Sequence, residues 1–107
     1  MNKFDRTIAH EKLVKQILLE LTTQGWLCWN NRTGAIKSQG RFQRYGLVGS
    51  SDIIAITPSG KFVAVEVKTG NAVQNKAQKA FEKAVRLRNA TYKIIHSYEE
   101  LMEWLNG

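Results

Sequence analysis

Two carboxylates and one ammonium group stand out as residues whose types and spacing could do chemistry. Glu66 and Lys68 are two positions apart in the stretch FVAVEVKTG, and Asp52 opens the preceding apolar run, DIIAIT. Residues i and i+2 of a strand point to the same face, so Glu66 and Lys68 share one face and the valines between them share the other. If the two runs pair as a hairpin, Asp52 can lie beside Glu66.

Two neighbouring carboxylates repel each other, and a cation between them relieves that repulsion. Oxygen ligands favour Mg²⁺ or Mn²⁺ over zinc or copper. Such an ion could polarise a phosphoryl oxygen and help to deprotonate a water, while Lys68 orients that water or stabilises the developing charge. This is the chemistry of phosphodiester hydrolysis. The alternative is an exposed ion pair between Glu66 and Lys68, with Asp52 capping a turn.

The positive charge of the chain is concentrated around these residues. The formal net charge is +7, but between Asn30 and Lys93 twelve basic residues face only three acidic ones, which gives this segment +9. A polyanion is the partner that such a segment favours. The alternative is a basic chain whose charge only keeps it in solution.

The apolar periodicity predicts the elements that must position these side chains. The run from Asp52 and the run through Glu66 form a hairpin about the turn Pro58-Ser59-Gly60. The other predicted elements are a helix from Thr7, as N-cap, to about Thr23, with Gly25 as its stop; a strand over Trp26 to Asn31; a loop over Thr33 to Ser50 holding at most a short strand around Arg41 to Tyr45; a helix from Gln74 to about Arg88; a strand over Tyr92 to His96; and a last helix from the cap Ser97 to about Leu105.

The order α-β-(β)-β-β-α-β-α predicts an α/β fold with a mixed sheet. The unit from Lys61 to His96 is strand, helix and strand, and its crossover requires a parallel pair beside the hairpin. We expect one domain over residues 1–107, because 107 residues are too few for two cores.

Several classes of protein are excluded by composition. Cys28 is the single cysteine, and His10 and His96 are far apart in sequence, so neither an internal disulfide nor a zinc site is expected. Both histidines are interpreted as structural, and Cys28 as a small buried strand residue. The N-terminus has no apolar signal segment and no stretch is long enough to span a membrane, which predicts an intracellular protein.

With Asp52, Glu66 and Lys68 in this arrangement, the sequence resembles the VRR-NUC (virus-type replication-repair nuclease) family of the PD-(D/E)XK nuclease superfamily. The resemblance covers nearly the whole chain in the family's order, and the combination of G-x-SD, E-x-K and Q-x-x-F is specific. The pieces that carry it are a first helix with Glu11, WNNRTG (Trp29 to Gly34), RYGLVGSSDIIAI (Arg44 to Ile56), PSGKFVAVEVKTG (Pro58 to Gly70) and a later helix with Gln78 and Phe81.

The resemblance implies a restriction-endonuclease-like fold and Mg²⁺- or Mn²⁺-dependent cleavage of DNA. Asp52 and Glu66 would hold the metal with the main-chain carbonyl of Val67, and Lys68 would be the catalytic lysine. Where the superfamily name has Pro, this chain has Ser51, which removes no metal ligand.

Two further residues gain a role only from the resemblance. Glu11 would contribute to the metal site from the first helix, directly or through water, although a glutamate early in a helix is also favoured by the helix dipole. Gln78 would position the lysine, the water or the phosphate; without the family spacing it would be interpreted as a solvated side chain.

The resemblance also implies a partner and a setting. Small free-standing members of the family occur in phages and bacteria and resemble Holliday-junction resolvases, which act as dimers. We therefore expect a cytoplasmic homodimer, bacterial or phage-encoded, that cuts branched DNA such as four-way junctions. The alternatives are a DNA-binding module that keeps the fold without cutting, and an accessory subunit of a replication or repair complex.

The DNA backbone is expected to be gripped by basic residues on two segments, the glycine-rich loop and the second long helix. A solvated surface is the alternative for each of them. Trp26, Trp29 and Phe81 are interpreted as core or dimer-interface aromatics rather than base-stacking platforms, and Trp104 as a core residue. The six residues expected to bind DNA are Arg32, Arg41, Arg44, Lys76, Lys79 and Lys83.

Overall fold

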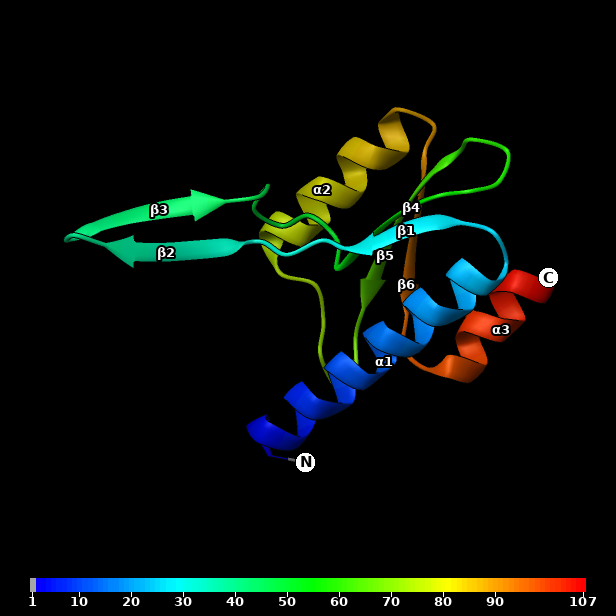
Figure 1. The fold of residues 1–107 in the computed structure, drawn as a ribbon, viewed down its shortest axis with the longest axis horizontal. Coiled ribbons are helices and arrows are strands. Elements are labelled where there is room, and N and C mark those ends of the chain that lie inside the picture. The colour runs from blue at the N-terminus through cyan, green and yellow to red at the C-terminus, as the bar shows by residue number, and fades with distance from the viewer. Residues whose placement is uncertain (1) are drawn as a thin grey trace.

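Three helices and six strands make up the computed structural model, which describes residues 2–107 (Figure 1). Their order confirms the predicted α/β arrangement and adds one strand, β2. None of the helices in this range is long and apolar enough to cross a membrane. The elements are α1 (Lys3–Thr23), β1 (Leu27–Asn30), β2 (Gly34–Ser38), β3 (Arg41–Tyr45), β4 (Ile53–Ile56), β5 (Phe62–Val67), α2 (Lys76–Leu87), β6 (Thr91–Ile95) and α3 (Tyr98–Asn106).

The main sheet is mixed, as predicted, with the strand order β1-β4-β5-β6. β4 pairs antiparallel with β1 and with β5, whereas β5 pairs parallel with β6 after the crossover through α2. Ile53 is opposite Val65 in the β4–β5 ladder. This register brings the residue before β4 alongside the end of β5, where the predicted chemistry lies.

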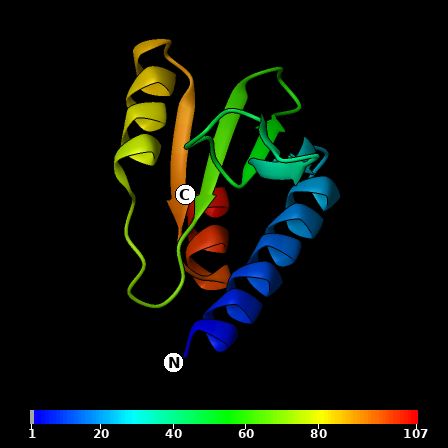
Figure 2. The same ribbon diagram turned by 90° about the vertical axis from the view of Figure 1, so that its left-hand side faces the viewer.

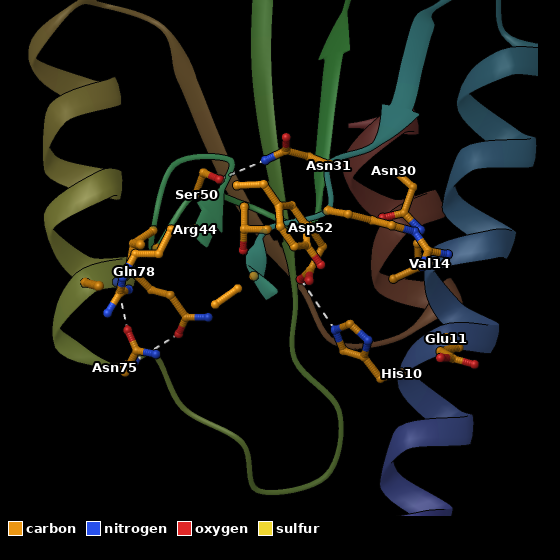
Figure 3. A pocket seen from close by; sticks show the side chains of 18 of the residues that line it. His10, Glu11, Val14, Asn30, Asn31, Arg44, Ser50, Asp52, Asn75 and Gln78 are labelled. Atoms are coloured by element: carbon orange, nitrogen blue, oxygen red, sulfur yellow. Dashed lines mark hydrogen bonds and ion pairs between the residues drawn. The ribbon is translucent and has the colours of Figure 1, made fainter. Parts of the chain in front are cut away.

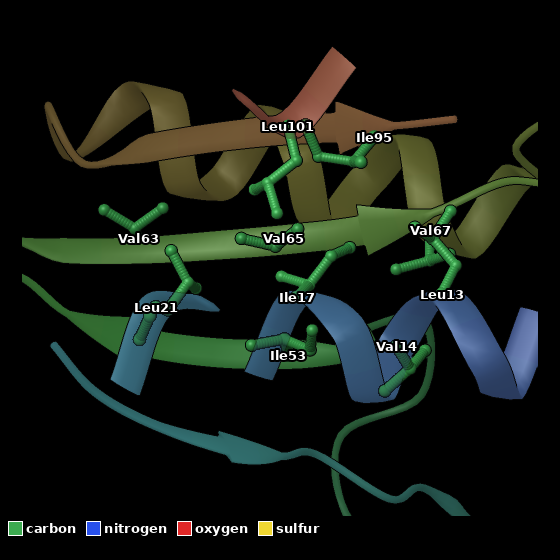
Figure 4. Close-up of a cluster of buried hydrophobic side chains, with 11 residues drawn as sticks. Leu13, Val14, Ile17, Leu21, Ile53, Val63, Val65, Val67, Ile95 and Leu101 are labelled. Atoms are coloured by element: carbon green, nitrogen blue, oxygen red, sulfur yellow. The ribbon is translucent and has the colours of Figure 1, made fainter. Parts of the chain in front are cut away.

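Helices cover both faces of the sheet. Figure 2 shows α2 on one side and α1 on the other. Val63, Val65 and Val67 face α1 and α3 in the larger apolar cluster (Figure 4), which confirms the predicted valine face, while Ala64 belongs to a second cluster with Val85 and Tyr92. Because β5 is covered on both faces, Glu66 is enclosed on the Ala64 side of the strand. The other buried members of the larger cluster are Leu13, Val14, Ile17, Leu21, Ile53, Ala55, Ile95 and Leu101.

Helix α1 begins earlier in the chain than predicted. Its N-cap is Asn2, whose side chain accepts a hydrogen bond from Asp5 N at 2.8 Å. The expected cap, Thr7, lies inside the helix, where its hydroxyl donates to the Lys3 carbonyl, a bond that satisfies a threonine within a helix. Gly25 ends α1 as predicted: at φ 88° it lets the next residue, Trp26, bond back to the Leu21 carbonyl in a Schellman motif.

The prediction of a loop over Thr33 to Ser50 is wrong for much of that segment. β2 and β3 form an antiparallel hairpin that projects from the body of the molecule (Figure 1). Its two-residue turn is Gln39-Gly40, and both residues have positive φ, as a type I′ hairpin turn requires. Glutamine at the first turn position and the lack of long apolar runs hide this hairpin in the sequence. We call β2, β3 and this turn the arm.

Two residues, Trp29 and Cys28, are more exposed than predicted. Trp26 and Trp104 pack edge to face with ring centroids 5.9 Å apart, and Phe81 packs against Tyr92. Trp29, by contrast, is exposed on the edge strand β1, so only its interface interpretation stays a prediction. Cys28 is partly buried rather than buried.

Candidate active site

The β4–β5 register brings Asp52 and Glu66 together, as predicted. Asp52 is held in place by the backbone of the neighbouring strand, because Val67 N donates a hydrogen bond to its Oδ2 at 2.8 Å. The preceding residue, Ser51, is buried and donates from its hydroxyl to the Ile53 carbonyl at 2.9 Å. Ser51 thus ties down the turn that leads into β4.

Glu66 lies in an unusual environment for a carboxylate. Its side chain is 1% exposed, and its Oε2 has no hydrogen-bond partner within residues 2–107. Burial, together with contact with the Asp52 carboxylate, raises the pKa of Glu66 to about 9 against the opposing charge of Lys68. A buried polar atom without a partner is costly in an apolar interior. Glu66 is therefore neutral at pH 7 unless a cation reaches it.

The pKa of Asp52 is shifted in the opposite direction, below its ordinary value. Burial would raise the pKa of Asp52, but hydrogen bonds from His10, Glu66 and Val67 N lower it to about 2. The two neighbouring carboxyl groups therefore differ in charge, one protonated and one ionised. Paired carboxyl groups with widely separated pKa values are typical of sites that bind a cation or transfer protons.

Lys68 and Gln78, both predicted as site residues, are joined by a direct hydrogen bond. Lys68 Nζ donates to Gln78 Oε1 at 2.9 Å. Gln78 is the third residue of α2 and belongs to a capping box, in which Asn75 N donates to the same Oε1 and Gln78 N donates to Asn75 Oδ1. The cap that starts α2 therefore also positions the amino group of Lys68.

His10 lies at the site, although the sequence interpretation treats it as structural. Its Nε2 is 3.4 Å from Asp52 Oδ2 (Figure 3), and this contact raises the pKa of His10. A helical pattern could have found it: His10 is one turn before Val14 and continues the buried stripe of α1, whereas Glu11 is about 100° further round the helix. The other histidine, His96, pairs with Glu100 at 3.0 Å.

Glu11 is not brought to the carboxylate pair. It lies at the edge of the same cleft as His10, but Figure 3 shows its carboxylate turned away from Asp52. Glu11 as a metal ligand, directly or through water, therefore stays a prediction. His10 is the α1 side chain that reaches Asp52.

A cleft of about 850 Å³ lies between α1, the arm, the loop before β4 and the start of α2. Asp52, His10 and Gln78 line it (Figure 3). The loop before β4 approaches α2 so closely that a Cβ on Gly49 would overlap the Ala77 carbonyl oxygen. The glycine of the G-x-SD motif is therefore needed to bring the Asp52 wall against the Gln78 wall.

The predicted DNA-binding residues are all exposed or partly exposed but fall into two groups. Arg32 and Arg44 line the cleft itself, and Arg41 stands at the tip of the arm, at the start of β3. Lys79 and Lys83 instead border a shallow depression along α2, and Lys76 is the first residue of that helix. Of the six, only Arg32 and Arg44 line the cleft that holds Asp52.

The donor set fits a hard divalent cation held in part by the protein. Asp52 and Glu66 supply carboxylate oxygens, one of them buried and without a partner, and the Val67 carbonyl belongs to the same strand end. Within residues 2–107, no three His, Cys, Asp or Glu side chains are grouped closely enough to form a cage of their own. Mg²⁺ is commonly bound in this way, by one or two carboxylates together with water and substrate phosphate.

Comparison with solved structures finds one described as "VRR_NUC domain", at a TM-score of 0.69 and 20% sequence identity. The match covers 91% of this chain and 94% of the other. No protein-family model and no curated protein sequence matches the chain. The shared fold, a mixed sheet with flanking helices, is the one expected from the sequence motifs. The chain therefore has the fold of a VRR_NUC domain.

Proposed function

We propose that this protein is a Mg²⁺- or Mn²⁺-dependent endonuclease that hydrolyses phosphodiester bonds in DNA. The observation that carries the proposal is Glu66: a fully buried carboxylate whose Oε2 has no partner among the described residues, placed beside an ionised Asp52 at a basic cleft. Folding encloses this group at a cost, and a bound cation is the partner that removes the cost.

Asp52, Glu66 and the Val67 carbonyl would hold the metal, which when bound would polarise a phosphoryl oxygen and lower the pKa of a bound water. The hydrogen bond from Val67 N fixes the direction of the Asp52 carboxylate. The hydrogen bond from His10 helps to keep that carboxylate ionised by lowering its pKa. Both contacts prepare Asp52 as a ligand before any cation arrives.

Lys68 is placed to act on the attacking water or on the charge that develops at phosphorus. Its ammonium group is restrained by Gln78 Oε1, so little side-chain freedom is lost when substrate binds. Gln78 lines the cleft, where its amide nitrogen can donate to a phosphate oxygen. Lys68 thus supplies charge and Gln78 supplies its position.

The substrate class follows from the basic cleft and from the resemblance to junction-cutting nucleases. Arg32 and Arg44 line the cleft with Asp52 and can hold phosphates near the scissile bond. Branched DNA, including four-way junctions, is the proposed substrate, and we propose that a homodimer binds it. Exposed Leu27 and Trp29 on the edge strand β1 give such a dimer an apolar surface. The proposed setting is the cytoplasm of a bacterium, with the protein encoded by the host or by a phage.

Cleavage of duplex, nicked, flap and four-way-junction DNA with Mg²⁺ or Mn²⁺ tests the proposal. Glu66→Ala should abolish metal-stimulated cleavage and leave DNA binding nearly intact, and the exposed Glu103→Ala serves as its control. Full activity of the Glu66→Ala protein would rule out the scheme. Binding without cleavage of any DNA form, with either metal, would instead favour a non-catalytic DNA-binding or accessory role.

A further inference from the structure

We propose that the cleft side of the arm recognises unpaired nucleotides in DNA, with Phe42 stacking on an exposed base and Lys37 and Arg44 binding the neighbouring phosphates. This inference rests on the proposed function and narrows its substrate. It predicts that the preferred DNA has unpaired bases at or beside the cleavage point, as at a fork, a flap or an open branch.

The register of the arm separates its two faces. Ala35 pairs with Arg44 and Lys37 pairs with Phe42, so these four side chains share one face. Ile36, which pairs with Gln43, is on the opposite face. Ala35, Phe42 and Arg44 of this face line the cleft that holds Asp52. From the opposite face only Gly34 and Tyr45, at the base of the arm, line it, while Ile36 and Gln43 do not. The face with Phe42 is therefore the one turned toward the proposed active site.

Phe42 has no role in the core of the fold. Its side chain is 76% exposed and belongs to neither apolar cluster. The Lys37 ammonium lies 5.8 Å from the centroid of the ring. An exposed ring with cations around it is the arrangement by which proteins hold single-stranded nucleic acid, because the ring stacks on a base and the cations follow the backbone.

Charge favours DNA over a second copy of the chain as the occupant of this face. From Asn31 to Ser51 the sequence has four basic residues and no acidic one. Two arms facing each other would bring like charges together, whereas a nucleic acid backbone neutralises them. Phe42 within this segment therefore faces a polyanion more favourably than it faces another arm.

Binding without cleavage provides the test. DNA forks that carry 2-aminopurine at the first unpaired position are titrated in EDTA with the wild-type protein, Phe42→Ala, Phe42→Tyr and the matched control Ile36→Ala, with fully paired duplex as the second substrate. Wild type should quench the 2-aminopurine fluorescence by stacking. Phe42→Ala should lose the quenching and bind the fork about 5- to 150-fold more weakly, the range for one lost base stack.

The controls distinguish base stacking from a general loss of apolar surface on the arm and from a change in oligomeric state. Phe42→Tyr and Ile36→Ala should retain the quenching, and binding to duplex should change little in any variant. Unchanged fork binding by Phe42→Ala, or an equal loss in Ile36→Ala, would overturn the proposal. So would a Phe42→Ala protein that changes its monomer–dimer balance in sedimentation but not its quenching, since the face would then join two copies. The binding assay omits metal, so its result is independent of cleavage. Quenching in this assay, combined with no cleavage in a separate assay with Mg²⁺ or Mn²⁺, would refute the proposed endonuclease and leave the stacking proposal intact.

Discussion

The substitution Glu66→Gln should stabilise the metal-free protein. Glutamine has the shape of the protonated carboxyl group and carries no charge that burial must neutralise. The pKa of Glu66 is raised to about 9 in the folded protein from an ordinary value of 4.5. A carboxyl group with a raised pKa contributes its full stability below pH 4.5, and that contribution is lost as the pH rises toward 9. Wild type should therefore weaken across this window, and Glu66→Gln should weaken less.

The size of the effect follows from the same values. Each pH unit between the two pKa values costs about 1.4 kcal/mol, so the difference between the proteins should grow from near zero at pH 4.5 to at most roughly 3 kcal/mol at pH 7. Domains of this size are stable by only about 5 to 15 kcal/mol in total. One buried carboxyl group thus takes a substantial share of the stability of the metal-free protein.

Urea unfolding in EDTA between about pH 5 and 8.5, followed by tryptophan fluorescence, measures this difference. Trp26 and Trp104 pack against the main cluster and report its loss. Glu103→Gln, on an exposed position of α3, is the control and should behave as wild type. Addition of Mn²⁺ should stabilise wild type and not Glu66→Gln. Equal stability of wild type and Glu66→Gln at every pH would refute the reasoning, because Glu66 would then be ionised and compensated by another group.

Three further substitutions test the proposed catalytic lysine, the core and the cleft. Lys68→Met should lower cleavage about 100-fold or more without weakening the calorimetric affinity for Mn²⁺, since Lys68 is no ligand; weaker Mn²⁺ binding would contradict that role. Ile17→Ala removes a fully buried side chain and should cost about 2 to 5 kcal/mol in urea unfolding, and a cost below about 1 kcal/mol would place Ile17 outside the core. Arg44→Ala should reduce the slope of log Kd against log salt by about 1 on any DNA, and an unchanged slope would show that Arg44 contacts no phosphate.

The elements of the main sheet could be predicted because local and long-range signals agree for them. The valines of β5 alternate with small or polar residues, the turn Pro58-Ser59-Gly60 fixes the hairpin, and α2 carries a clear apolar stripe. The parallel β5–β6 pair then follows from chain connectivity alone. The same alternation placed Glu66 and Lys68 on one face, and the hairpin placed Asp52 beside them.

Other features depend on tertiary contacts that sequence patterns do not encode. The arm has no apolar face to bury, so its strands give no hydrophobic period, and its turn lacks the usual asparagine or aspartate. The depth at which Glu66 is buried depends on α2 covering the Ala64 face of β5. The contact of His10 with Asp52 could be predicted in part, since the buried stripe of α1 indicates that His10 faces the sheet.

The site and the core share one strand, and this sharing accounts for how closely the carboxylates are held. Val63, Val65 and Val67 anchor β5 to the main cluster on one face, while Ala64 packs into the second cluster on the other. With both faces fixed, β5 cannot twist Glu66 into solvent to relieve its burial. Stability comes from the apolar residues, and the burial of Glu66 offsets part of it. A chain that gained nothing from a cation at this position would be more stable with an uncharged residue there, and that difference is what the Glu66→Gln measurement detects.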